Sequence, residues 1–163
     1  MIGLAFYISC DFPEAITGYN SLSFNHEYAS SLNSLDDSKY PVGFGVLVKT
    51  VKIGNGLNDF TKAANIIFSF DMINKLSWIK AHVGDKDVKI GTNIGINANA
   101  YRVCWSLSPC RIVSIIKRKM NKSGTALISQ IAYSTLDTHL LAGVERFRVM
   151  YSPISEEVIF EVR

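Results

Sequence analysis

The chain has 163 residues, of which 48% are hydrophobic, 19% charged and 11% aromatic. This length and composition indicate one folded domain and exclude an intrinsically disordered chain, because the apolar side chains are numerous enough to form a core. The net charge of +3 is small and is not gathered into one tract, so we expect no nucleic-acid partner. No window contains eighteen consecutive apolar residues, so we also expect no stable membrane insertion.

The cysteine and histidine content bears on the compartment and on metal binding. The three cysteines are Cys10, Cys104 and Cys110, and the three histidines are His26, His82 and His139. An odd number of cysteines without a C-x-x-C pair predicts reduced thiols and a cytoplasmic location. Because no two histidines share a ligand spacing, the sequence predicts no metal site, and we expect no cofactor.

The N-terminal part of the chain is the least regular. An apolar strand is predicted at Ile2–Ile8, and a segment rich in Ser, Asn and Asp follows it. Such a composition favours turns, although a short helix is predicted near Glu27–Leu35. We therefore expect an irregular segment with one strand over residues 1–39 and a single α+β domain over residues 40–163.

A strand and a helix open the domain. Strand composition over Val42–Ile53 ends at Gly54-Asn55-Gly56, and an apolar stripe with helical spacing follows. The stripe consists of Leu57, Phe60, Ala64, Ile67 and Phe68. The two glycines lack the third glycine of a dinucleotide fingerprint, since position 59 is Asp59, so they predict only a tight turn.

The rest of the chain is predicted to form strands. They are expected at Leu76–Val83, Ile94–Leu107, Arg111–Lys119, Thr125–Thr135, Gly143–Met150 and Glu156–Val162. One helix ahead of consecutive short strands favours an α+β fold, in which a curved, largely antiparallel sheet packs on one main helix.

Such a sheet and helix often enclose an apolar cavity, which is a natural site for a small molecule. The aromatic residues that could line it are Phe60, Trp78, Tyr101, Trp105, Tyr133 and Phe147. The alternative, that these side chains only fill the core, stays open for each of them.

One histidine has neighbours that suggest chemistry. His139 lies close in sequence to the hydroxyl of Ser134 and the carboxylate of Glu145, as a hydrolase or an isomerase would require. The alternative is that His139 fixes a loop by hydrogen bonds, because loops between strands also collect Ser, Thr, Asp and His.

The run from Tyr133 to Phe147 resembles the signature of a known family. The matching residues are Tyr133, Thr135, Leu136, His139, Gly143, Glu145 and Phe147, and upstream Gly54, Gly56, Phe60, Pro109 and Arg111 match in order. This signature is that of uncharacterised protein family 0548, the domain-of-unknown-function family numbered nineteen-ninety. The resemblance covers roughly residues 40–163 and implies a fold similar to the helix-grip architecture, without implying an activity.

Three features depart from the family pattern. Ser134 stands where the family usually has Gly, and Val144 replaces an acidic residue. Family members continue beyond the position of Arg163 into a helix, so relative to them the chain is expected to be C-terminally shortened. In related helix-grip architectures such a helix closes the cavity, so this sheet is expected to expose an apolar face.

These observations lead to one main functional hypothesis and two alternatives. The main hypothesis is that a small apolar or amphipathic, lipid-like ligand binds in the sheet–helix cavity. The aromatic residues above would contact it, and the polar site residues would be Arg111, Thr135, His139 and Glu145. The alternatives are an enzyme built on His139, Glu145 and Ser134, and a structural or interaction module, for example a homodimer formed through the uncapped sheet face.

Overall fold

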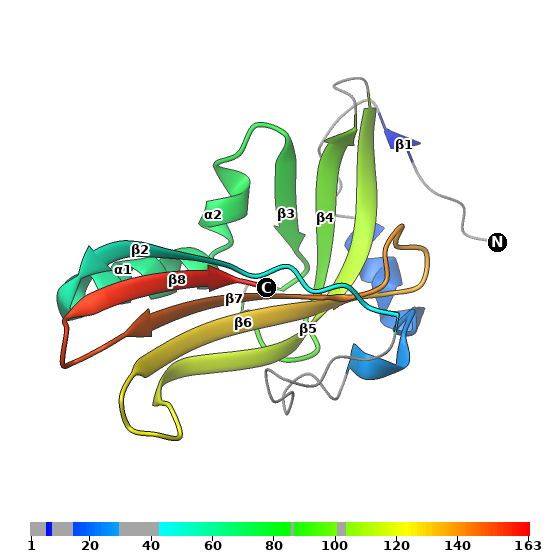
Figure 1. Ribbon diagram of the computed structural model, residues 1–163. Coiled ribbons are helices and arrows are strands. Elements are labelled where there is room, and N and C mark those ends of the chain that lie inside the picture. Colours follow the sequence, from blue (N-terminus) through cyan, green and yellow to red (C-terminus); the bar gives the residue numbers. More distant parts are fainter. Residues whose placement is uncertain (1–5, 8–14, 30–42, 86, 101–103) are drawn as a thin grey trace.

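The computed structural model describes residues 6–7, 15–29, 43–85, 87–100 and 104–163 (Figure 1). Its main feature is a curled antiparallel sheet with the strand order β2-β8-β7-β6-β5-β4-β3, to which β1 adds by pairing with β5. The strands are β1 (Phe6–Tyr7), β2 (Lys49–Asn55), β3 (Ile79–Val83), β4 (Asn93–Ala100), β5 (Cys104–Met120), β6 (Leu127–Thr135), β7 (Val144–Tyr151) and β8 (Glu157–Val162).

One main helix packs on this sheet, so the predicted α+β fold class is confirmed. The helix α1 (Gly56–Phe68) buries Phe60, Ala64 and Ile67, all of which belong to the predicted stripe. It contacts β6, β7 and β8, and a short helix, α2 (Asp71–Asn74), follows it. The side of the sheet that carries α1 is called the helix face below, and the opposite side is called the outer face.

Strand alternation assigns the side chains of β5, β6 and β7 to these two faces. Ile131 lies opposite Phe147 in the register of β6 and β7, and both belong to the core under α1. The next pairs along the strands place Ser114 opposite Ala132 and Ala132 opposite Arg146. Because successive side chains of a strand point to opposite faces, this second row lies on the outer face.

The structure corrects several strand boundaries. Of the predicted strand Val42–Ile53, residues 43–48 lie outside β2, which begins at Lys49, and the strand predicted from Leu76 begins at Ile79. The predicted strand Ile94–Leu107 is two strands, because Ala98 pairs with Ser106 where β4 and β5 run antiparallel. The apolar alternation continues on both sides of this reversal, and the link contains neither Gly nor Pro, so no turn signal marked it. The predicted strand Arg111–Lys119 is the second half of β5.

The N-terminal segment packs beside β4 and β5. It contains the 3-10 helices η1 (Ala15–Ser21) and η2 (Glu27–Ala29). Of the predicted strand Ile2–Ile8 only β1 is described, and the predicted helix Glu27–Leu35 is described only as far as Ala29.

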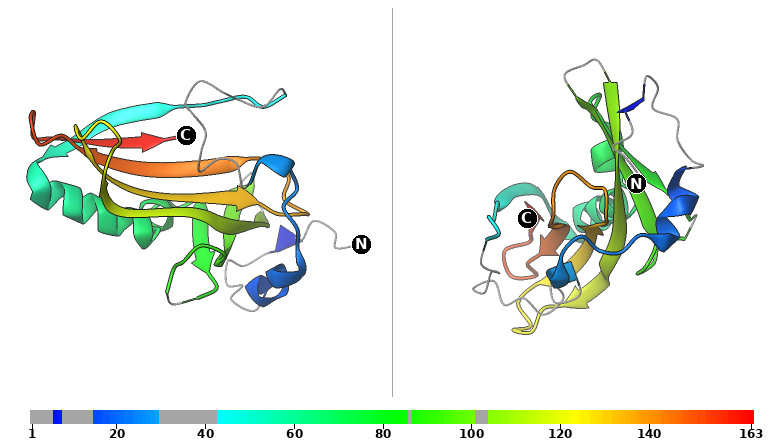
Figure 2. Two further views of the ribbon diagram at one scale, coloured as in Figure 1. Left: turned by 90° about the horizontal axis from the view of Figure 1, so that it is seen from below. Right: turned by 90° about the vertical axis from the view of Figure 1, so that its right-hand side faces the viewer.

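The segment 43–48, which leads into β2, runs along the side of β5–β8 away from α1 (Figure 2). Among the described residues, no helix is long and apolar enough to cross a membrane.

Candidate functional site

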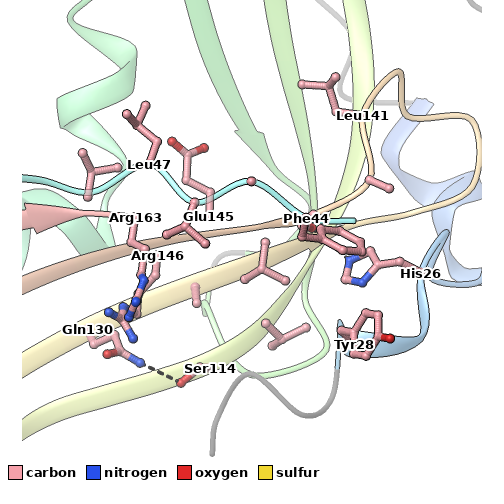
Figure 3. Close-up of a pocket in the computed structure, with 18 residues that line it drawn as sticks. His26, Tyr28, Phe44, Leu47, Ser114, Gln130, Leu141, Glu145, Arg146 and Arg163 are labelled. Carbon is pink, nitrogen blue, oxygen red and sulfur yellow. Dashed lines mark hydrogen bonds between the residues drawn. The ribbon is translucent and has the colours of Figure 1, made fainter. Parts of the chain in front are cut away.

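The structure contains a cavity of about 420 Å³ at the point where β8 ends (Figure 3). Its floor consists of Val113 and Ser114 of β5 together with Gln130 and Ala132 of β6. Ser114, Gln130 and Ala132 belong to the outer face, and Val113 lies at an irregularity in the pairing of β5 with β6. Leu141–Arg146 and Phe44–Leu47 form its walls.

The backbone of β8 closes one end of this cavity. Val162 pairs with Lys49 of β2 and with Phe147 of β7. Beyond it, the Arg163 N–H donates to the Arg146 carbonyl over 3.0 Å, and the Arg146 N–H donates to the Arg163 carbonyl over 2.8 Å. Both Val162 and Arg163 line the cavity.

Aromatic residues from two separate segments close the other end. The Phe44 ring lies 5.7 Å from the His26 ring and 5.6 Å from the Tyr28 ring, measured between centroids. At the rim, Leu47 is 71% exposed and Leu141 is 72% exposed, so apolar side chains surround the opening. Apolar walls of this kind are typical of small-molecule sites.

His26 ties the N-terminal segment to the cavity wall. Its Nε2 lies 2.8 Å from the Ser134 Oγ and 3.0 Å from the Gly143 carbonyl oxygen. Because a carbonyl oxygen can only accept, Nε2 carries the proton and donates to it. His26 Nε2 therefore acts as a hydrogen-bond donor beside the Ser134 hydroxyl and does not act as a base toward it.

Thr135 and Asn25 fix the same wall. The Thr135 hydroxyl accepts from the Gly143 N–H over 2.9 Å, and it lies 2.6 Å from the Asn25 Oδ1, to which it donates. The Asn25 side-chain amide donates to the Leu141 carbonyl over 2.9 Å. These bonds hold Leu141–Gly143 against the N-terminal segment.

The polar side chains of the floor form a network. The Gln130 side-chain amide donates to the Ser114 hydroxyl over 3.2 Å, and the Arg148 Nε donates to the Gln130 Oε1 over 2.9 Å. Glu161 accepts from the Arg146 guanidinium over 2.9 Å and lies 3.6 Å from that of Arg148. The Glu161 carboxylate thus partly compensates the positive charges of Arg146 and Arg148 beside the cavity.

Glu145 is the predicted site residue that lines the cavity. Its carboxylate accepts a hydrogen bond from the Tyr133 hydroxyl. Burial raises the pKa of Glu145, and the Tyr133 hydrogen bond opposes this effect by lowering it. Burial, and then the charge of Glu145, raise the pKa of Tyr133 well above its ordinary value, so Tyr133 stays protonated and donates.

The predicted aromatic residues lie elsewhere. Phe60, Tyr133 and Phe147 are buried in the core under α1, where the Tyr133 and Phe147 ring centroids are 6.0 Å apart. Trp78 is 56% exposed just before β3. Trp105 is half-buried on β5 opposite Tyr7 and Asn99, and Tyr101 lies outside the described residues.

Two predicted polar residues hold other parts of the chain. Arg111 donates to the carbonyls of Tyr19 and Leu22 over 2.8 and 3.1 Å, and its Nε donates to Asn93 Oδ1, so it fastens η1 to the sheet. His139 accepts from the Leu141 N–H over 3.0 Å, and burial lowers its pKa. Ser134 bonds to His26, and no described contact joins Ser134, His139 and Glu145 to one another.

The cavity residues His26, Tyr28 and Phe44 were not predicted from the sequence. They lie in segments without a helical or strand period, so only the tertiary contacts bring them to the cavity.

Within the described ranges, no group of three or more His, Cys, Asp or Glu side chains is placed to hold a metal ion.

Fold and cavity together define an α+β domain whose curled antiparallel sheet carries a helix on one face and a cavity on the other. The chain belongs to the family described as Domain of unknown function (DUF1990), whose model matches residues 27–163. This match confirms the resemblance seen in the run from Tyr133 to Phe147. No curated protein and no solved structure matches the chain significantly.

Proposed function

We propose that the protein binds a small apolar or amphipathic molecule in the cavity at the end of β8. The observation that carries this proposal is the cavity itself, with a volume of about 420 Å³ and mostly apolar walls. Small-molecule sites have volumes of roughly 300–1,000 Å³ and combine apolar walls with a few polar groups.

The proposed site lies on the outer face of the sheet and not under α1. The aromatic residues predicted to line a sheet–helix cavity, Phe60, Tyr133 and Phe147, pack in the core with exposed fractions of 1%, 5% and 6%. On the outer face, Phe44, Val46 and Leu141 would contact the apolar part of a ligand. Gln130 of the floor and Arg146 of the wall would hydrogen-bond its polar end.

Two neighbouring leucines provide a matched pair of variants. Leu141 lines the cavity and is 72% exposed, whereas Leu140, which is 61% exposed, does not belong to the lining. Either side chain can be replaced by Asp at little cost in stability, because both are at the surface.

The test measures binding of the fluorescent probe 1-anilinonaphthalene-8-sulfonate to the wild type and to both variants. Leu141→Asp is expected to weaken binding about tenfold, since a charge at the rim repels the sulfonate and removes apolar contact. Leu140→Asp is expected to leave the affinity within about twofold of the wild-type value. Equal weakening by both substitutions, or no binding to the wild type, would contradict the proposal.

A further inference from the structure

We propose that the end of the sheet that carries the β5–β6 and β7–β8 turns docks on the surface of an anionic lipid bilayer. In this arrangement exposed cations contact the lipid headgroups, and two exposed apolar side chains, Met120 and Ile154, enter the interface between headgroups and acyl chains. This inference goes beyond the proposed function, because the cavity lies at the opposite end of β7.

The β5–β6 hairpin is strongly basic near its turn. Its exposed cations, called the basic hairpin below, are Lys117, Arg118, Lys119 and Lys122. No Asp or Glu occurs in the sequence between Asp87 and Asp137. In the described part of the chain, none of the four cations forms an ion pair. Because its positive charge is not compensated within the hairpin, the basic hairpin attracts anionic surfaces.

A β-bulge distributes these cations over both faces of the hairpin. The pairing of β5 with β6 shifts in register between Ile116 and Lys119. Lys117 lies on the helix face, where its Nζ is 5.8 Å from the centroid of the Phe68 ring. Lys119 pairs with Ile128 and lies on the outer face. Cations therefore surround the turn, as an approach to the bilayer with the turn first requires.

Exposed apolar side chains project from the same end of the sheet. Met120, the last residue of β5, is 44% exposed, and Ile154 in the β7–β8 turn is 87% exposed. The two turns are neighbours, because Leu127 at the start of β6 pairs with Tyr151 at the end of β7. Figure 1 shows both turns at the left end of the sheet. Exposed apolar side chains beside cations are typical of surfaces that bind at a membrane interface.

Hydrogen bonds within the β7–β8 turn order the chain around Ile154. The Ser152 N–H donates to the Glu157 carbonyl over 3.1 Å, and the Ser155 N–H donates to the Ser152 hydroxyl over 3.3 Å. An apolar side chain that an ordered turn holds in water gains free energy when it enters an apolar environment. Docking of this turn on a bilayer supplies such an environment.

The acidic side chains at this end leave the surface basic. Glu157 pairs with Lys52 over 2.9 Å, and Asp59 accepts from the Asn55 N–H over 3.1 Å. Glu156, in the β7–β8 turn, is exposed. The cations of the basic hairpin outnumber this carboxylate, which favours an anionic bilayer over a neutral one. The exposed apolar side chains of the two turns are not aromatic and cannot stack on bases, which favours lipid over nucleic acid.

The experiment measures binding of the full chain to lipid vesicles by flotation. Vesicles of mixed phosphatidylcholine and phosphatidylglycerol are compared with vesicles of phosphatidylcholine alone. The affinity for the anionic vesicles is expected to be at least about tenfold higher and to fall as salt is added, because salt screens exposed charges.

Two double variants with the same change in net charge test the basic hairpin. Lys119→Gln with Lys122→Gln removes two of its cations, whereas Lys75→Gln with Lys89→Gln removes two exposed cations from the connections on either side of β3. One cation near an anionic bilayer contributes about a fivefold change in affinity, so the first double variant is expected to bind at least about tenfold more weakly. The second is expected to stay within about twofold of the wild type.

A matched pair of isoleucines tests the apolar contact. Ile154→Ser acts in the β7–β8 turn, and Ile90→Ser replaces a side chain that is 61% exposed between β3 and β4. Both residues are at the surface, so neither substitution is expected to prevent folding. Ile154→Ser is expected to weaken binding about fivefold, because part of the isoleucine surface leaves water on docking. Ile90→Ser is expected to stay within about twofold of the wild type.

Equal affinity of the wild type for the two kinds of vesicle overturns the proposal. Equal losses in the two double variants, or unchanged binding of Ile154→Ser, overturn it as well, because the turns then do not contact the bilayer. Tighter binding to a mixed-sequence RNA than to the anionic vesicles overturns it and assigns the basic hairpin to nucleic acid. Each of these results leaves the proposed function standing, since none of the substituted residues lines the cavity.

Discussion

At the residue scale, Glu145 links the helix face to the cavity. Its backbone belongs to the cavity wall, and its carboxylate is bonded by Tyr133, whose ring lies in the core next to Phe70 and Phe147. A partly buried carboxylate loses hydration, and this loss raises its pKa. The protonation of this cavity-lining residue is therefore expected to differ between the folded and the unfolded chain, which makes stability depend on pH.

The pH dependence of stability provides the test of this coupling. Because the pKa of Glu145 is higher in the folded than in the unfolded chain, the folded state binds more protons above pH 4.5, the ordinary value. The free energy of unfolding thus loses this contribution as the pH rises from about 4.5 through the folded pKa. Urea denaturation should show that Glu145→Gln lacks this loss, so its stability relative to wild type increases with pH.

The exposed Glu156 supplies the control for this measurement. Glu156→Gln removes an exposed carboxylate and therefore controls for the loss of one surface charge. An identical pH profile for Glu145→Gln and wild type would show that the carboxylate is not affected by burial.

At the scale of elements, the link between β6 and β7 is positioned by its hydrogen bonds to the N-terminal segment. Phe24 forms a β-bridge with Leu136, and the Asp137 N–H donates to the Ser23 carbonyl over 2.8 Å. The Thr135 hydroxyl bonds to Asn25 and Gly143 in the same region. Although distant in sequence, the two segments form one wall of the cavity.

Replacing Thr135 by Val removes the bonds of its hydroxyl while nearly preserving its shape. Thr135 is 7% exposed, so the Gly143 N–H and the Asn25 oxygen would lose a buried partner. The free energy of unfolding is expected to fall by about 1–3 kcal/mol, as measured by urea denaturation.

Thr125 is the matched control, because its hydroxyl also bonds to an asparagine side chain but lies in the exposed turn between β5 and β6. Thr125→Val is expected to change the free energy of unfolding by less than about 0.5 kcal/mol. Similar losses in the two variants would mean that the wall is not held by Thr135.

The elements themselves were largely predictable from the sequence. The helix α1 was predicted because Phe60, Ala64 and Ile67 recur at helical spacing and bury one stripe. The boundary between β4 and β5 was not predicted, because the apolar alternation on both sides of residues 101–103 is typical of one continuous strand. Local patterns report burial and period, but they do not report where a chain reverses without Gly or Pro.

At the scale of the whole molecule, the cavity could be predicted only in part. The sequence pointed to the run from Tyr133 to Phe147, and this run supplies the wall residues Gly143 and Glu145. It did not point to His26 or Phe44, because these side chains meet only through long-range packing. The face of the sheet that carries the cavity could not be predicted either, because it depends on how β8 pairs with β2 and β7.

The most direct test of the account is to map the binding site by nuclear magnetic resonance. Titration of the labelled protein with 1-anilinonaphthalene-8-sulfonate should shift the backbone amides of Phe44–Leu47 and Leu141–Arg146, which form the cavity walls. Shifts confined to Phe60 and its neighbours under α1, or no shifts at saturating dye, would contradict the placement of the site at the end of β8.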